Sequence, residues 1–385
     1  MHGKVLFCAT VDYHFKAFHL PVLKWFKQCG WEVHVAASGE LDLPLADLKF
    51  NLPISRSPFH SRNWKAYKQL RSIIRQQDYD LIHCHTPMGG VLARLAAREA
   101  RKAGTKVIYT AHGFHFCKGA PLQNWLLYYP IEKLLARLTD CLITINNEDF
   151  SLAVSRRFNA GRIAHIHGVG VDTDRFQPVS LSEKLRLRED SPYSPDDQLL
   201  FCAAEFNRNK NQRVLIEAIA RLKDEMPQVK LLLAGEGPML NECRRLTAEL
   251  GVAERIHFLG YRADIDKLLP MCDAAVSGSL REGLPVNVME AMACGLPVVA
   301  ARNRGHLELI IDQRNGYIAN PHDAVDFSAR IRLLCESAEL RRRMGSESLK
   351  LVQKYNLNQV LDELCNIYKL YMGQPKLERM EWSVQ

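Results

Sequence analysis

The chain has 385 residues, which is long enough for two domains that each bury a core of their own. With 47% hydrophobic and 24% charged residues its composition is that of an ordinary globular protein, which excludes a fibrous or largely disordered chain. No apolar run reaches the roughly 18–20 residues of a membrane span, and the apolar run after Lys4 is only strand-sized, so we expect neither a signal peptide nor a transmembrane segment.

The net charge of +8 is unevenly distributed along the chain. Residues 1–170 hold 22 Lys and Arg against 12 Asp and Glu, whereas the remainder holds 29 against 31. A basic half without aromatic-rich nucleic-acid motifs favours phosphate-bearing substrates or an anionic membrane surface over DNA, with solvated surface charge as the alternative. The eleven cysteines lack a C-x-x-C pair and are expected to be reduced, as in a cytoplasmic protein.

The first half alternates short apolar runs with amphipathic segments. The run KVLFCA at residues 4–9 is typical of a buried parallel strand. Further strands are predicted at residues 32–36, 80–85, 106–110 and 141–146, with helices ending near residues 29 and 103 and spanning residues 64–75 and 124–138. The helix at 64–75 has a strongly basic polar face.

A second alternation follows a segment rich in Pro, Ser and charge at residues 177–197, which contains a short helix. Strands are predicted at residues 198–203, 229–234, 255–258, 273–277 and 297–301, and helices at 211–223, 239–250, 265–271 and 286–294. Repeated βα units in both halves predict an α/β fold of two Rossmann-like, doubly wound domains that face a cleft, residues 1–176 and 177–356.

One βαβ unit, residues 272–310, carries the strongest candidate site. Open parallel sheets bind ligands at the carboxyl ends of their strands, so we expect a ligand at the loop 279–285. Amides of this glycine-containing loop and of the helix N-terminus can receive ligand oxygens, and the Glu290 carboxylate suits a pair of vicinal hydroxyls. The alternative is that Glu282 and Glu290 only follow the preference of acidic groups for helix starts.

Other candidates follow from their position. His112 and Gly113 come directly after a predicted strand, where such sheets bind ligand. Asp12, Tyr13 and His14 in the first loop line the cleft or, alternatively, only pack the loop. The aromatic residues of the helix at 124–138 belong to the core or, together with the basic helix at 64–75, to a membrane-interface patch.

The pattern E-x7-E from Glu282 to Glu290, followed by A-x-A-x-G-x-P-V at residues 291–298, resembles the signature of family-4 retaining glycosyltransferases, which have the GT-B fold. The segment G-V-D-x-x-x-F at residues 170–176 agrees with it. Residues 4–21, 110–121 and 279–292 are most similar to the exopolysaccharide glycosyltransferases of bacteria. The resemblance covers nearly the whole chain and implies that the C-terminal segment 357–385 packs back on the N-terminal, acceptor-side domain.

The resemblance implies a donor site for a nucleotide sugar, best UDP-linked. Two departures from the family pattern stand out: the first loop has no glycine, and Glu205 replaces a usual arginine, so that Arg208 supplies the charge beside Lys210. Glu290 would hold the ribose, His112 would contact the sugar near the reacting carbon, and Glu282 would hold sugar hydroxyls. The remaining donor-binding residues are Gly235, Gly237, Leu259, Tyr261, Arg262, Gly283, Leu284 and Pro285.

The implied activity is metal-independent, retaining transfer of a hexose to a lipid-linked or saccharide acceptor in exopolysaccharide, capsule or biofilm synthesis. The protein would act in the cytoplasm, with peripheral association at the inner membrane face, without a cofactor and without a nucleic-acid partner; no metal cluster is evident at ligand spacing in the sequence. Two alternatives stay open: a nucleotide-sugar-binding scaffold subunit without catalysis, and a nucleotide-sugar epimerase on the same fold.

Overall fold

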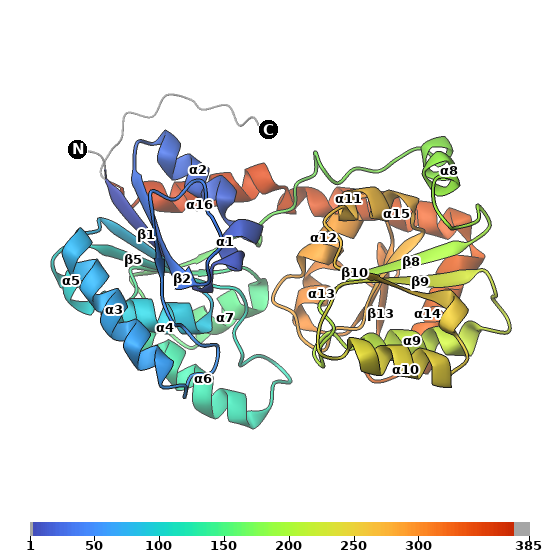
Figure 1. Cartoon of the computed structure of the whole chain (residues 1–385), viewed down its shortest axis with the longest axis horizontal. Helices are drawn as coiled ribbons and strands as arrows, with labels where there is room; N and C mark the ends of the chain where they lie inside the picture. The colour runs from blue at the N-terminus through green and yellow to red at the C-terminus, as the bar shows by residue number, and fades with distance from the viewer. Residues whose placement is uncertain (1–2, 373–385) are drawn as a thin grey trace. The chain divides into compact units, whose positions relative to one another are not determined.

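The structure, a computed structural model, describes residues 3–372 and divides into two compact units (Figure 1). Unit 1 comprises the residues up to Val169 together with those from Asn358 onward, and unit 2 comprises Gly170–Leu357. The division falls at Val169, whereas the sequence analysis places the end of the first domain at residue 176. The C-terminal helix belongs to unit 1, and the part of the predicted C-terminal segment beyond residue 372 lies outside the described residues.

Unit 1 is a seven-stranded sheet in the order β3-β2-β1-β4-β5-β6-β7, in which every pair of neighbours is parallel. Its strands are β1 (Lys4–Val11), β2 (Glu32–Ser38), β3 (Leu48–Asn51), β4 (Leu81–His85), β5 (Lys106–Ala111), β6 (Cys141–Thr144) and β7 (Arg162–His165). Its helices are α1 (Tyr13–Phe18), α2 (Leu20–Gln28), α3 (Arg62–Gln77), α4 (Pro87–Ala96), α5 (Arg98–Lys102), α6 (Leu122–Leu135), α7 (Asn147–Ser155) and α16 (Leu357–Lys369).

The last helix completes unit 1 through aromatic packing. Figure 1 shows α16 beside α2, and the Trp25 and Tyr368 rings are stacked with centroids 5.7 Å apart. The Tyr368 hydroxyl lies 2.6 Å from Nδ1 of His83 on β4, and the Glu363 carboxylate lies 2.7 Å from Nδ1 of His167. These contacts hold α16 against β4 and against the segment that follows β7.

Unit 2 is a six-stranded sheet in the order β10-β9-β8-β11-β12-β13, again with parallel neighbours. The strands are β8 (Gln198–Ala203), β9 (Val229–Ala234), β10 (Ile256–Gly260), β11 (Ala274–Ser277), β12 (Val298–Ala301) and β13 (Gly316–Ala319). The helices are α8 (Leu181–Glu189), α9 (Gln212–Leu222), α10 (Leu240–Glu249), α11 (Ile265–Leu268), α12 (Val286–Ala293), α13 (Arg304–Leu309), α14 (Ala324–Glu336) and α15 (Ala338–Val352).

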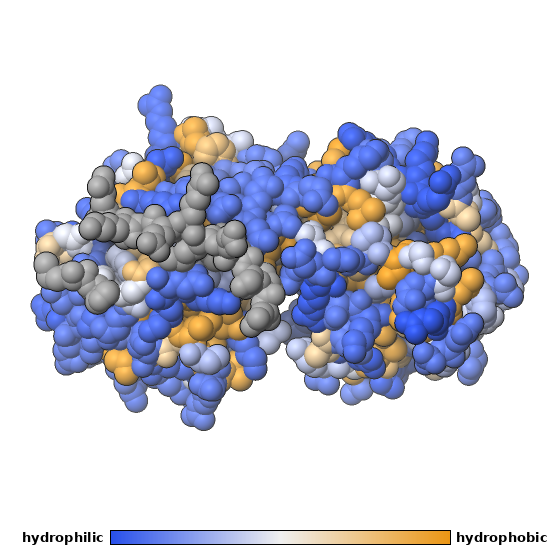
Figure 2. Space-filling view, turned by 90° about the horizontal axis from the view of Figure 1, so that it is seen from above, coloured by the Kyte–Doolittle hydropathy of each residue, from blue (hydrophilic) through white to orange (hydrophobic). Residues whose placement is uncertain are grey.

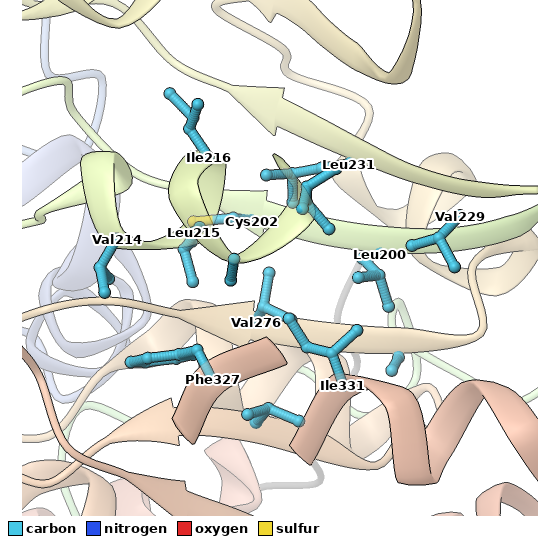
Figure 3. Packing of buried hydrophobic residues seen from close by; sticks show 14 of the residues in the cluster. Leu200, Cys202, Val214, Leu215, Ile216, Val229, Leu231, Val276, Phe327 and Ile331 are labelled. Carbon is cyan, nitrogen blue, oxygen red and sulfur yellow. The ribbon is translucent and has the colours of Figure 1, made fainter. Parts of the chain in front are cut away.

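The core of unit 2 lies between the central strands and the helices that cover them. Figure 3 shows Leu200 and Cys202 of β8 and Val276 of β11 packed with side chains from α9 and α14, among them Phe327. All of these side chains are almost fully buried. Their apolar runs explain why the strands form here, because a parallel sheet covered on both faces needs strands without polar side chains.

The predicted class, two doubly wound parallel-sheet α/β domains, is confirmed. Three short strands were not predicted: β3, β7 and β13. The helix predicted at 64–75 is α3, and it buries Leu70 and Ile74 while Lys65 and Lys68 point to solvent.

The surface in Figure 2 is mainly hydrophilic, with hydrophobic residues in scattered patches. No helix in residues 3–372 combines the length and the apolar composition that a membrane crossing requires. All eleven cysteines are unpaired thiols, and ten of them are buried, which agrees with the predicted use of cysteine as a small apolar residue.

Candidate active site

The centre of the unit 2 sheet provides the site's framework. β8 and β11 are neighbours in the sheet although two strands, β9 and β10, lie between them in the chain, so the connections after β8 and β11 run in opposite directions. Doubly wound sheets bind their ligands at this kind of switch point. The loop after β8 spans residues 204–211, and the loop after β11 spans residues 278–285.

An ion pair and two backbone-directed hydrogen bonds join these two loops. Lys210 Nζ lies 2.6 Å from Glu282 Oε1, and both side chains are largely buried. The amide of Leu280 donates to the Asn209 carbonyl at 2.8 Å, and the Asn209 side chain donates to the Arg281 carbonyl at 2.9 Å. The structure thus brings together the cation predicted for the diphosphate and the carboxylate predicted for the sugar.

Glu290 lies on α12, and its electrostatic surroundings were not foreseen. Burial raises the pKa of the Glu290 carboxyl to about 7, the nearby Arg175 lowers it, and Asp266 raises it further. Arg175 donates to the Asp266 carboxylate at 2.6 Å and to the Ala263 carbonyl at 2.9 Å. Arg175 was missed as a candidate, although it stands inside the segment G-V-D-x-x-x-F at residues 170–176.

The loops after β9 and β10 lie against the loop after β8. The Gly235 amide donates to the Gly260 carbonyl at 2.7 Å, and the Phe206 amide donates to the Glu236 carbonyl at 2.8 Å. Gly235 and Gly237 have φ angles of 140° and 149°, and a Cβ at either would lie within 2.5 Å of a backbone carbonyl oxygen. Only glycine fits both requirements, so the two glycines let this loop pack against the backbone of the loop after β8. Their predicted contact with the nucleotide stays a prediction.

The remaining predicted donor residues differ in exposure. Arg208 is exposed and has no ion-pair partner among the described residues, whereas Arg262 pairs with Asp264. Tyr261 is 65% exposed, and Leu259 is half-buried at the end of β10. An exposed guanidinium and an exposed ring are available to a ligand without breaking a native contact.

The segment before α12 is extended and leads into the helix. Pro285 has φ −78° and ψ 115°, and Leu284 is buried, so the segment is anchored by its apolar side chains. Gly283 precedes them and is half-buried. Arg304 of α13, which was not predicted, donates from Nε to the Glu282 carbonyl at 3.2 Å and so supports the same loop.

Unit 1 contains a cavity of about 600 Å³ at the ends of β1 and β4. Two of the three residues predicted for the acceptor side, Tyr13 and His14, line it. The third, Asp12, is buried elsewhere: its carboxylate accepts from Lys49 at 2.6 Å and from the Leu41 amide at 2.8 Å. The other lining groups are mostly apolar and come from α4, α6 and the segment 56–59.

His112 belongs to a group of four histidines at the same end of the sheet, called here the histidine cluster: His14, His19, His85 and His112. Burial holds the pKa values of the first three well below the usual range and that of His112 at about 4, and neighbouring imidazoles lower those of the first three further. The four rings are therefore neutral at pH 7. His19 and His85 were not singled out from the sequence, because the cluster joins three distant segments and has no local spacing pattern.

Two family models match this chain: "Glycosyl transferase 4-like" over residues 4–146 and "Glycosyl transferases group 1" over residues 183–351. EpsD of Bacillus subtilis (strain 168) is 52% identical over 379 residues, which cover 98% of this chain and 100% of EpsD. The chain belongs to the family-4 glycosyltransferases of the GT-B fold. Membership in this family makes the protein a transferase enzyme.

More distant relatives of the glycosyltransferase agree. The UDP-Gal:alpha-D-GlcNAc-diphosphoundecaprenol alpha-1,3-galactosyltransferase of Escherichia coli is 25% identical over 315 residues, covering 80% of this chain and 79% of that protein. Among solved structures, Anabaena HepE in complex with UDP and glucose superimposes with a TM-score of 0.76 at 20% identity, covering 96% of this chain and all of HepE. At that identity the similarity concerns the fold.

Proposed function

We propose that this glycosyltransferase transfers a hexose, with retention of configuration, from a UDP-sugar to a hydroxyl group of a lipid-linked saccharide, in the synthesis of an exopolysaccharide or capsule. The observation that carries the proposal is the Lys210–Glu282 pair, which joins two loops at the switch point of the unit 2 sheet. Retention is what the E-x7-E segment implies for the family.

Lys210 and Arg208 are proposed to bind the donor diphosphate. An ammonium group has three protons, so Lys210 can keep its contact with Glu282 and still donate to a phosphate oxygen. Arg208 is exposed and can approach the same phosphates with its planar guanidinium. Together they would stabilise the negative charge that develops on the leaving nucleotide, without a metal ion at the diphosphate.

Glu290 and Glu282 are proposed to bind the hydroxyl groups of the donor. The Glu290 carboxylate can accept from both ribose hydroxyls, and Glu282 with the amides around Gly283 would hold the sugar. Leu259, Tyr261 and Arg262 are proposed to contact the base, and Gly235 and Gly237 to let the backbone approach the nucleotide. A role of His112 at the reacting carbon stays a prediction.

The cavity of unit 1 is proposed to receive the acceptor. Its mostly apolar lining suits the lipid-proximal part of such a molecule, while Tyr13 and His14 provide polar groups. The lipid diphosphate of the E. coli relative's acceptor supports this choice of acceptor class. The lipid acceptor named for the E. coli relative and the basic first half of this chain support a site of action at the cytoplasmic membrane face.

A screen of UDP-, GDP- and ADP-sugars by thermal shift and by nucleotide release tests the donor assignment. We expect stabilisation and slow turnover with a UDP-sugar. Lys210→Ala removes a charge-assisted hydrogen bond worth about 1.5–3 kcal/mol, so kcat/KM should fall about 10- to 100-fold. Glu290→Ala should abolish the thermal shift.

Matched controls are Lys350→Ala and Glu339→Ala, which remove an exposed cation and an exposed anion from α15. Both should bind and turn over the donor as the wild type does. Binding of every nucleotide with equal strength, or unchanged behaviour of Lys210→Ala and Glu290→Ala, would overturn the proposal. Protection by UDP without any turnover would instead favour the scaffold alternative.

A further inference from the structure

The histidine cluster concentrates four ring nitrogens in a small volume at the ends of β4 and β5. The candidate ligand atoms of its members all lie within 4.8 Å of one another. His85 ends β4, and its strand neighbour across the ladder is Thr110, two residues before His112. His14 and His19 come from α1 and the start of α2, so three separate segments converge.

The distances between these rings are close to those of a coordination sphere. Nε2 of His14 lies 3.0 Å from Nε2 of His19, and Nδ1 of His85 lies 3.2 Å from Nε2 of His112. A tetrahedral zinc ion with bonds of about 2.0–2.1 Å needs ligand nitrogens about 3.3 Å apart. Two pairs already have this spacing, and the remaining separations need to contract by at most about 1.5 Å through small side-chain rotations.

The protein alone leaves this cluster incompletely satisfied. Nε2 of His85 is buried and has no hydrogen-bond partner among the described residues, whereas both ring nitrogens of the adjacent His83 have partners, the Tyr368 and Thr110 hydroxyls. A buried polar nitrogen without a partner costs free energy, which a water beside Nε2 would recover; an ion bound through Nδ1, the atom of His85 that faces His112, does not contact Nε2.

Space for a ligand is present beside the rings. His19, His85 and His112 border a cavity of about 20 Å³, whose other walls are mostly apolar side chains of unit 1, such as Val22 and Leu361. Such a volume holds roughly one water-sized particle. An apolar shell around a set of neutral imidazoles favours coordination by limiting the access of water.

We propose that the histidine cluster is a binding site for one divalent transition metal ion of the zinc class. Four imidazoles without a carboxylate suit zinc, copper or nickel and are poor ligands for Mg²⁺ and Ca²⁺, which prefer oxygen. The ion would tie α1 and α2 to the ends of β4 and β5. It would also fix His14, which lines the proposed acceptor cavity.

This site goes beyond the proposed function, in which cations of unit 2 neutralise the diphosphate. A metal-bound His112 would contact the ion in place of the sugar contact predicted for it. The test uses the full chain without a polyhistidine tag, stripped of metal with a chelator. Zn²⁺ affinity is measured by competition with a chromophoric chelator, and Co²⁺ serves as the spectroscopic probe. We expect one saturable Zn²⁺ per chain, an increase in melting temperature with Zn²⁺ but not with Mg²⁺, and a tetrahedral Co²⁺ spectrum without thiolate charge-transfer bands.

The variant His14→Gln/His112→Gln removes two half-buried ligands, and His60→Gln/His322→Gln removes two exposed histidines as the control. Loss of an outer-sphere partner alone typically weakens a metal site about 10- to 100-fold, so the first variant should lose at least about tenfold in affinity. The control should bind as the wild type does. Circular dichroism checks folding, and His14→Gln alone serves if the double variant does not fold.

Absence of saturable Zn²⁺ binding, an unchanged affinity of the His14→Gln/His112→Gln variant, or thiolate bands in the Co²⁺ spectrum would each overturn the proposal. Because metal binding is measured without sugar donor, these outcomes are independent of whether the transfer activity is confirmed.

Discussion

The Glu290 carboxyl group is present in both its protonated and its charged form near neutral pH. Burial raises its pKa to about 7, with Arg175 and Asp266 acting in opposite directions. Two ribose hydroxyls donating to the carboxylate stabilise its charged form, so nucleotide binding is expected to lower this pKa and to release a proton. A ligand that prefers the deprotonated site must bind more tightly as the pH rises through 7.

We therefore expect the affinity for the UDP-sugar to increase from pH 5.5 to pH 8 and to level off above it. A UDP-sugar is the suitable probe, since its diphosphate diester does not titrate in this range. Isothermal titration calorimetry at several pH values measures the dependence, and Glu290→Gln should remove it, because an amide does not ionise. A wild-type affinity that stays constant from pH 5.5 to pH 8 would contradict the assignment of Glu290.

Site residues could be predicted from the sequence where they belong to a recognisable motif. Their contact partners in the folded protein could not. Lys210, Glu282 and Glu290 were singled out because spacing and family resemblance mark them. Arg175 and Arg304 were not, since the proximity of Arg175 to Glu290 and the hydrogen bond from Arg304 to the Glu282 carbonyl depend on how distant segments of the chain meet. For the same reason the sequence did not reveal that Lys210 and Glu282 form a pair with each other.

One buried carboxylate fastens α8 to the start of β11. Asp273 accepts from Arg188 Nη2 at 2.7 Å, from Lys184 Nζ at 2.6 Å and from the Leu199 amide at 2.7 Å. Arg188 is itself buried and also donates to the Met271 carbonyl. Burial raises the pKa of Asp273, but Lys184 and Arg188 more than offset this, and the pKa is lowered overall.

Asp273→Ala should destabilise unit 2 strongly, because it leaves a buried guanidinium without its counter-charge, a change that costs about 3–5 kcal/mol. Urea unfolding, followed by hydrogen exchange in β8 and β11, measures the loss. A lowered folded-state pKa means that the contribution is present above the unfolded pKa of 3.8 and disappears as the pH falls through the folded value. The stability difference between wild type and variant should therefore shrink in acid.

Glu183→Ala on the same helix is the matched control, since it removes an exposed pair with Arg186. We expect no resolvable change in its unfolding. Equal stability of Asp273→Ala and Glu183→Ala would show that the buried network does not fasten α8.

Strands could be predicted from the sequence where their residues form a continuous apolar run. The runs LLFCA in β8 and LLLA in β9 are buried on both faces and are recognisable without any context. β3 is an edge strand whose residues alternate lysine and asparagine with partly exposed apolar side chains, so its sequence carries no such run. Short strands of this kind form because a neighbouring strand offers hydrogen bonds. Since that neighbour is distant in the sequence, the local residues alone do not predict the strand.

At the scale of the molecule, the excess of positive charge belongs to unit 1, which also carries several strongly exposed apolar side chains. Phe59 is 81% exposed, and Leu122 and Leu126, four residues apart on α6, are 72% and 69% exposed. The aromatic residues of α6 belong to the core and not to a membrane-interface patch, because Trp125, Tyr128 and Tyr129 pack against the core of unit 1. Leucines and not aromatic rings are thus the exposed apolar groups of this helix.

This arrangement predicts binding of the full chain to anionic vesicles. Each basic residue near an anionic surface contributes about 1 kcal/mol, and burying an exposed leucine contributes about 1.5–3 kcal/mol. Co-sedimentation should be strong with phosphatidylglycerol vesicles at low salt, weaker at high salt and weakest with neutral lipid. Lys65→Gln/Lys68→Gln should reduce the salt-dependent part of the binding.

Leu122→Ser/Leu126→Ser should reduce the partition coefficient at least about fivefold, because insertion of these side chains into the interface is lost. Leu181→Ser is the matched control, since this leucine is 73% exposed but lies on α8 of unit 2. If the α6 variant and the control lose binding equally, the vesicle contact is not made by α6. If neutral and anionic vesicles bind equally, the basic charge of unit 1 has no part in the binding, and the exposed apolar side chains of this glycosyltransferase alone carry it.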